Sequence, residues 1–82
     1  MLNVSVISPE AVLYQGETTS VVAPAYDGEV GILTGHAPMM ALLGKGVLRL
    51  GDAGGRKFNV EGGFLQVVDN TVRVVTEKAS AA

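Results

Sequence analysis

Hydrophobic and polar residues alternate along several short stretches of this chain, which is the pattern of strands with one buried face. Leu2, Val4 and Val6 alternate with polar residues until Ser8-Pro9 ends the stretch. Similar stretches recur along the chain, and Gly, Pro or Asp residues separate them. We predict strands near residues 2–6, 11–17, 20–24, 30–32, 39–43, 47–50, 58–60, 64–68 and 72–76.

Residues typical of tight turns lie between these stretches. Tyr26–Glu29 contains Asp-Gly, and Asp69-Asn70 is a two-residue turn of the kind that joins adjacent antiparallel strands. Gly51–Gly55 predicts a flexible hairpin loop. Gly62-Gly63 predicts a break between two strands, either as a bulge or as a point where two backbones approach closely.

The composition agrees with strands and not with helices. Thirteen Val, two Ile and five Thr supply β-branched side chains, which suit a pleated surface better than a helix. No window of eleven residues shows a helical period free of glycine. The sequence predicts an all-β fold, a small antiparallel β-sandwich or flattened barrel of about 8–10 short strands. We expect one domain over residues 1–82, with residues 77–82 as a frayed or weakly helical tail.

Charge and residue usage exclude several functional classes. The chain has no cysteine, so it can form no disulfide and no thiol nucleophile. Residues 1–44 contain no Lys or Arg, and the chain has no basic cluster to contact nucleic-acid phosphates. One histidine without a HExxH motif argues against a catalytic metal site. The longest charge-free run, residues 30–44, is too short and too interrupted for a membrane span, and no signal peptide is evident.

The stretch from Gly28 to Pro38 is the most unusual in the chain. Its glycines could indicate a phosphate loop, but no Gly-Lys-Ser or Gly-Lys-Thr and no helical pattern follows. His36 could act as a general base only with a partner near it in space, and no Ser or Cys motif accompanies it. The simpler hypothesis, which we favour, is that His36 hydrogen-bonds its own loop.

The apolar run Met39–Leu43 allows two interpretations. Such runs usually belong to the core. In a strand, however, alternate side chains face opposite ways, so one set of Met and Leu would lie on the outer surface and contact a partner. Methionine suits an adaptable contact surface. The sequence leaves both interpretations open.

The same residues carry a resemblance to a known family. The run Gly-Glu-Val-Gly-Ile-Leu-Thr-Gly-His-Ala-Pro at 28–38 resembles the signature of the epsilon subunit of F-type ATP synthases, called delta in mitochondria. Residues 8–10, 14–17, 45–49 and 60–67 are also similar to that family, in the same order along the chain. Thr34 departs from the family, which often has Pro there, so the loop is expected to be less rigid.

The resemblance implies a β-sandwich without catalytic activity in the central stalk of a rotary ATP synthase. Such a subunit links the gamma subunit to the membrane c-ring within the alpha/beta/gamma/delta/epsilon assembly, and so couples ion translocation to ATP synthesis. It implies no cofactor, no nucleic acid and no membrane insertion, and a peripheral location on the cytoplasmic side of a bacterial energy-transducing membrane. The family's C-terminal helical hairpin has no counterpart in these residues, so its inhibitory and ATP-binding roles are not carried over. The alternative is a free-standing β-sandwich that binds a small ligand or peptide.

The resemblance also implies two contact sites. The c-ring contact is the turn with Asp27, Gly28 and Glu29. Because residues 1–44 carry only acidic charge, we expect Glu29 to present an uncompensated carboxylate to basic groups of the ring. The gamma contact comprises Ser8, His36, Ala37, Pro38, Met39, Met40 and Leu42.

Overall fold

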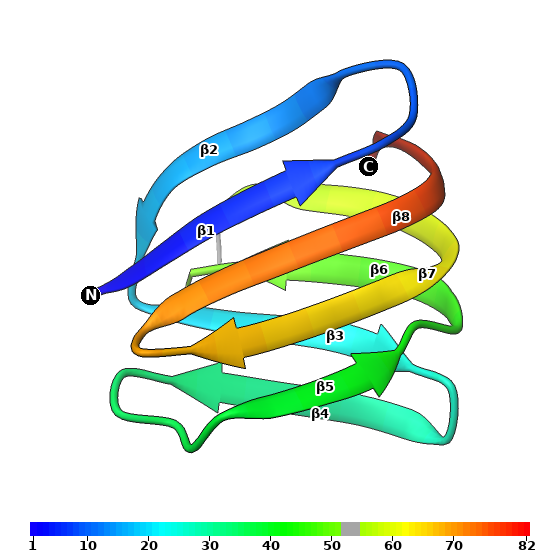
Figure 1. The fold of residues 1–82 in the computed structure, drawn as a ribbon. Coiled ribbons are helices and arrows are strands. Elements are labelled where there is room, and N and C mark those ends of the chain that lie inside the picture. The colour runs from blue at the N-terminus through cyan, green and yellow to red at the C-terminus, as the bar shows by residue number, and fades with distance from the viewer. Residues whose placement is uncertain (52–54) are drawn as a thin grey trace.

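The computed structural model describes residues 1–51 and 55–82, which form eight strands and no helix (Figure 1). Within these residues, accordingly, there is no long apolar helix that could cross a membrane. The strands are β1 (Leu2–Ile7), β2 (Val12–Thr18), β3 (Ser20–Ala25), β4 (Gly28–Leu33), β5 (Met39–Leu42), β6 (Lys45–Leu50), β7 (Lys57–Val68) and β8 (Thr71–Ala81). The prediction of an all-β fold is confirmed.

The strands form one sheet that folds over into two layers. Their order is β2-β1-β8-β7-β6-β3-β4, and β5 pairs with β7 beside this path. In Figure 1, β2, β1, β8, β7 and β5 form a front layer, and β6, β3 and β4 lie behind it. All pairs are antiparallel except β1 with β8, which is parallel. The sheet is therefore mixed, whereas the sequence predicts a purely antiparallel one.

The core lies between the layers and follows the predicted alternation. In β1 the side chains of Leu2, Val4 and Val6 are buried, and the residues between them are not. Because successive side chains of a strand point to opposite faces, each strand contributes every second residue to the core. The remaining buried hydrophobic residues are Val21, Ala23, Ile32, Leu43, Leu48, Leu50, Phe58, Val60, Leu65, Val67, Val72 and Val74.

The Asp69-Asn70 turn matches its prediction closely. Asp69 and Asn70 have φ of 48° and 60°, so both adopt the left-handed conformation that a two-residue hairpin turn requires. The turn between β3 and β4 is tighter than expected, because Ala25 already pairs with Gly28. Of the hairpin loop expected at 51–55, residues 52–54 lie outside the described residues.

The two strands expected around Gly62-Gly63 are one strand, β7, which bends there. Both glycines have positive φ, 73° and 101°, and this lets the backbone turn without ending the strand. Residues 57–61 pair with β6 of the back layer, and residues 64–67 pair with β5 of the front layer. The bend therefore joins the two layers.

The expected frayed tail is also corrected, since β8 continues to Ala81. Its last residues pair with the first half of β7, where Phe58 is opposite Ala81 and Glu61 is opposite Lys78. Ala79 packs against the core, and its small side chain suits that position. The ladder with β7 satisfies the backbone groups that a frayed end would leave to water.

Candidate functional site

Strand β5 divides its side chains between core and surface. Met39 and Ala41 pack against the core cluster, whereas Met40 and Leu42 are each 66% exposed. The outward position is confirmed for Met40 and Leu42 and the core position for Met39, while contact of the outward pair with a partner stays a prediction. Two large apolar side chains thus project from the edge of the front layer.

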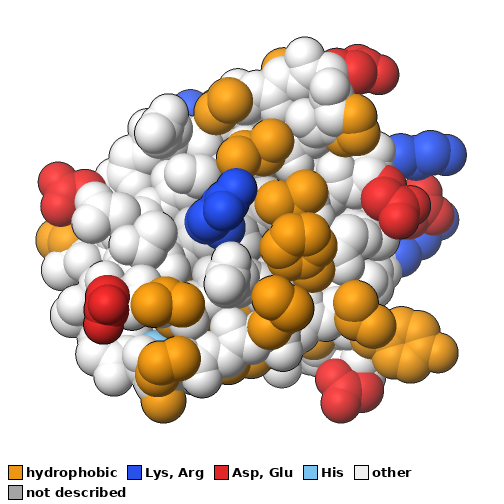
Figure 2. Space-filling model, in the orientation of Figure 1, with side chains coloured by type: hydrophobic (Ala, Val, Ile, Leu, Met, Phe, Trp, Pro, Cys, Tyr) orange, Lys and Arg blue, Asp and Glu red, His pale blue; other side chains and the backbone are white. Residues whose placement is uncertain are grey.

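Leu42 is the end of a row of apolar side chains that crosses the front layer. Register places Leu42 opposite Phe64, Phe64 opposite Val75, Val75 opposite Ile7, and Ile7 opposite Val12. We call these five residues the apolar row. Leu42 and Val12, at its two ends, are 66% and 59% exposed, and the other three are half-buried. Figure 2 shows hydrophobic side chains in a line across this face.

Sequence reasoning missed four members of this row. The available signal was a pair of adjacent apolar residues in an alternating strand, as in Val6-Ile7 and Val74-Val75. One member of such a pair must face outward. Contiguous apolar surface of this kind marks an interaction site more often than single exposed residues do.

The loop between β4 and β5 is held by hydrogen bonds at both ends. The backbone N–H of His36 donates to the Leu33 carbonyl at 3.1 Å, and the ring Nδ1 of His36 donates to the Ala37 carbonyl at 2.7 Å. The hypothesis that His36 bonds its own loop is therefore confirmed. Among residues 1–51 and 55–82, no group of three or more acidic or histidine side chains could hold a metal ion.

Asn70 fixes this loop from another part of the chain. Its side-chain Oδ1 accepts a hydrogen bond of 2.7 Å from the backbone N–H of Gly35, 35 residues away. Gly35 has a φ of 87°, so the loop turns sharply where Asn70 holds it. Asn70 is a positioning residue for the His36 loop, whereas the sequence pattern predicts only its role in the turn.

We expect Asn70→Gly to release the loop and leave the turn intact, because glycine adopts positive φ readily but offers no acceptor. The amide of Gly35 should then exchange with solvent about 2- to 13-fold faster, since loss of one such bond costs roughly 0.5–1.5 kcal/mol. Asn70→Asp keeps the acceptor and should retain the protection. Nuclear magnetic resonance of the amide checks this, and equal exchange in both variants would contradict it.

The residues predicted to contact gamma do not form a single cluster, and Met39 among them packs against the core. Ser8 follows β1 at one end of the layer, where its hydroxyl and the backbone of Ala11 bond each other at 3.2 Å. His36 precedes β5 at the other end (Figure 1). The apolar row, which contains Ile7 and Leu42, connects the side near Ser8 to β5.

The turn proposed to meet the c-ring lies next to the end of the apolar row. Tyr26 and Asp27 form its tip, and Tyr26 is 81% exposed. The backbone N–H of Tyr26 donates to the Leu42 carbonyl at 2.8 Å, which ties the tip to β5. The tip and the outward side chains of β5 are therefore held in a fixed position relative to each other.

Glu29 forms an ion pair with Arg49, whereas the sequence predicts that its charge is uncompensated. The guanidinium Nη2 of Arg49 lies 3.3 Å from Glu29 Oε2. Strand β3 pairs with both β4 and β6, so it brings the acidic first half of the chain beside the basic second half. Both side chains are largely exposed, so the pair is worth only about 0.2–1 kcal/mol.

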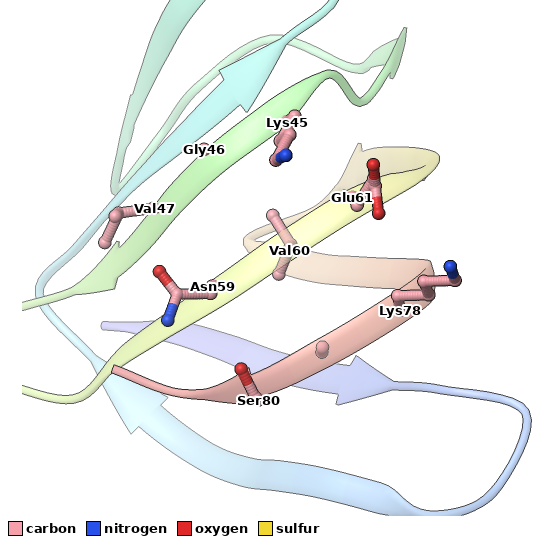
Figure 3. A pocket seen from close by; sticks show the side chains of 9 residues that line it. Lys45, Gly46, Val47, Asn59, Val60, Glu61, Lys78 and Ser80 are labelled. Atoms are coloured by element: carbon pink, nitrogen blue, oxygen red, sulfur yellow. The ribbon is translucent and has the colours of Figure 1, made fainter.

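A hollow of about 400 Å³ lies on the outer side of β6, β7 and β8. Lys45, Glu61 and Lys78 form one of its walls, and Val47, Asn59 and Ser80 form the other (Figure 3). Its two cations flank one carboxylate, so its charge selects no ligand class strongly.

Comparisons with known proteins agree on one family. Over residues 1–82 the chain matches the family described as "ATP synthase, Delta/Epsilon chain, beta-sandwich domain". It is 53% identical over 77 residues to the ATP synthase epsilon chain of Leptospira borgpetersenii serovar Hardjo-bovis (strain JB197), which covers 93% of this chain and 61% of that one. The ATP synthase epsilon chain of Chlorobium limicola is 40% identical over 77 residues, covering 92% of this chain and 88% of that one. The chain thus spans 61% of the length of the Leptospira relative.

Solved structures share the fold. A chain of the Euglena gracilis mitochondrial ATP synthase, in a structure described as OSCP/F1/c-ring, superposes with a TM-score of 0.86 at 24% identity, covering 98% of this chain and 52% of that one. A chain of the Tetrahymena thermophila mitochondrial ATP synthase central stalk and c-ring superposes with a TM-score of 0.82 at 18% identity, covering 98% and 66%. At these identities the likeness shows the β-sandwich fold alone.

Proposed function

Because the chain belongs to the family of the β-sandwich domain of ATP synthase delta/epsilon chains, we propose that it is a non-catalytic module of the rotor. It links the gamma subunit to the c-ring within the alpha/beta/gamma/delta/epsilon assembly, so that ion translocation is coupled to ATP synthesis. Its place is peripheral, on the cytoplasmic side of the energy-transducing membrane. The names of its relatives support this role.

The observation that carries the proposal is the apolar row on the front face. Gamma docks on this face, with Met40 and Leu42 as anchors and with Ser8 and residues 36–39 at its margins. Large apolar side chains that lose their water at the centre of an interface supply most of its binding energy. Here β5 presents two of them on a strand that the core holds rigidly through Met39 and Ala41.

The c-ring contacts the tip formed by Tyr26 and Asp27, together with Gly28 and Glu29. To transmit torque between gamma and the ring, the gamma contact and the ring contact must lie on one rigid domain. The hydrogen bond between Tyr26 and Leu42 supports this, because it joins the tip to the strand that anchors gamma. Torque then passes through a single sandwich, and no bound ligand takes part.

Glu29→Gln is expected to weaken ring association by about 0.2–1 kcal/mol, and less at high salt, because a contact at the rim of an interface is screened by water and ions. Arg49→Gln is the matched control. It breaks the same ion pair but keeps the carboxylate, so it should not weaken association. Binding to purified c-ring at two salt concentrations measures both. Equal weakening by the two variants would show that only the internal pair matters.

The proposal is tested by recovering the tagged chain from membranes of its own organism and identifying the proteins that come with it. Gamma and c subunits should be recovered in constant ratio to the chain. The alternative function, a free-standing module that binds a ligand in the hollow of Figure 3, predicts a monomer without these subunits. Recovery of the chain as a free monomer would contradict the rotor function.

A further inference from the structure

A second, smaller hollow lies on the front face beside the apolar row. It has a volume of about 90 Å³, and its lining residues are Gln66, Val68, Thr71 and Arg73. They come from β7 and β8, where Gln66 is opposite Arg73 and Val68 is opposite Thr71. Gln66 is also opposite Met40 of β5, so the hollow adjoins the proposed gamma anchors.

Three of its four lining side chains can donate hydrogen bonds. The guanidinium of Arg73 has five N–H donors in a planar fork, the Gln66 amide has two, and the Thr71 hydroxyl has one. Within residues 1–51 and 55–82, the one ion pair is that of Arg49 with Glu29, so no carboxylate of this part of the chain lies within 4 Å of the Arg73 guanidinium. The set suits a carboxylate, which accepts two parallel N–H bonds from arginine.

Docking on the apolar row would also remove water from Arg73. Arg73 stands two residues before Val75 on the same side of β8, so a partner that covers Val75 covers its neighbour too. Removing water from a cation is costly unless the partner supplies an opposite charge with good hydrogen-bond geometry. An apolar docking face with one cation in it therefore selects a partner with a matching acid.

We propose that this hollow receives the carboxylate of an Asp or Glu side chain of the gamma subunit, with Arg73 as the residue that determines specificity. The inference rests on the proposed function and adds the chemistry of the contact. The gamma surface is then mostly apolar where it covers the apolar row, and it carries a single acidic side chain beside that contact. The volume is suited to one carboxylate group and not to a peptide.

Binding of gamma to Arg73→Glu tests this directly. The variant places two carboxylates against each other, so we expect Kd to rise about 30-fold or more. Arg73→Gln removes the charge only and should raise Kd by a smaller factor. Lys57→Glu makes the same change of charge on an exposed residue of β7 whose neighbour is β6 of the back layer, and it should leave Kd within about twofold.

Thermal unfolding of each variant shows whether it is folded. Arg73 and Lys57 are both exposed, so all three variants should fold. The proposal is overturned if Arg73→Glu binds gamma as the wild type does, or loses no more affinity than Lys57→Glu. If the wild-type chain itself does not bind gamma, the proposed function fails together with this inference. If Met40→Glu abolishes binding and Arg73→Glu does not, the inference alone fails.

Discussion

Gly63→Ala is expected to lower the free energy of unfolding by about 3–5 kcal/mol, the largest effect on stability of any change considered. A Cβ at this position would meet the backbone carbonyl oxygen of Val75 and lie 2.7 Å from the Cα of Thr76. Neither backbone atom can move without disturbing the ladder between β7 and β8. The φ of 101° adds strain for any residue with a side chain. Thermal unfolding should show a midpoint at least about 12 °C lower.

Gly31→Ala is the matched control. Gly31 lies in β4, where an added Cβ would have no atom within 4 Å and φ is not in the left-handed region. Alanine should be neutral there, or stabilise by about 0.5 kcal/mol through lower entropy of the unfolded chain. If Gly63→Ala unfolded at the same temperature as Gly31→Ala, this would contradict the inference that β7 and β8 approach too closely for a side chain at position 63.

The double variant Met40→Glu with Leu42→Glu should lose at least about 3 kcal/mol of binding to gamma, more than about 100-fold in Kd. Two carboxylates would be buried without partners at the centre of the interface. Because both side chains are 66% exposed in the free chain, the variant should still fold. Titration calorimetry with purified gamma gives Kd, and the thermal midpoint should remain close to that of the wild type.

Val47→Glu controls for the added charge. Val47 is an exposed hydrophobic residue of β6, on the far side of the sandwich and in the wall of the larger hollow. It should bind gamma normally. Full binding by the folded Met40 and Leu42 double variant would refute the assignment of β5, and loss of binding by Val47→Glu would move the interface to the other layer.

Much of the fold was predictable from sequence because the signals are local. Alternation in residues 2–6 specifies the buried face of β1, and Asp69-Asn70 specifies a turn with two positive φ values. Gly62-Gly63 predicts a break between two strands, as a bulge or a close backbone approach, because glycine commonly interrupts a strand. Only the pairing of β7 with both β5 and β6 shows that it is a bend.

The contact surface was predictable only in part, because it depends on register between strands. Alternation within 39–43 indicated that Met40 and Leu42 could lie outside together. Their continuation through Phe64 and Val75 requires four strand pairings that no local pattern reveals. The same limitation explains the Glu29–Arg49 pair, whose members are 20 residues apart and meet across β3.

Photo-cross-linking from position 64, where Phe64 lies in the apolar row, tests most directly whether gamma docks on the front face. A photoreactive phenylalanine analogue at this position preserves the aromatic ring, and the same analogue at Val47 reports on the opposite side of the sandwich. After illumination of the assembled enzyme, mass spectrometry identifies the cross-linked protein. If gamma docks on the front face, the analogue gives a gamma adduct from position 64 and none from position 47. A gamma adduct from position 47, or none from position 64 in an assembled enzyme, would contradict it.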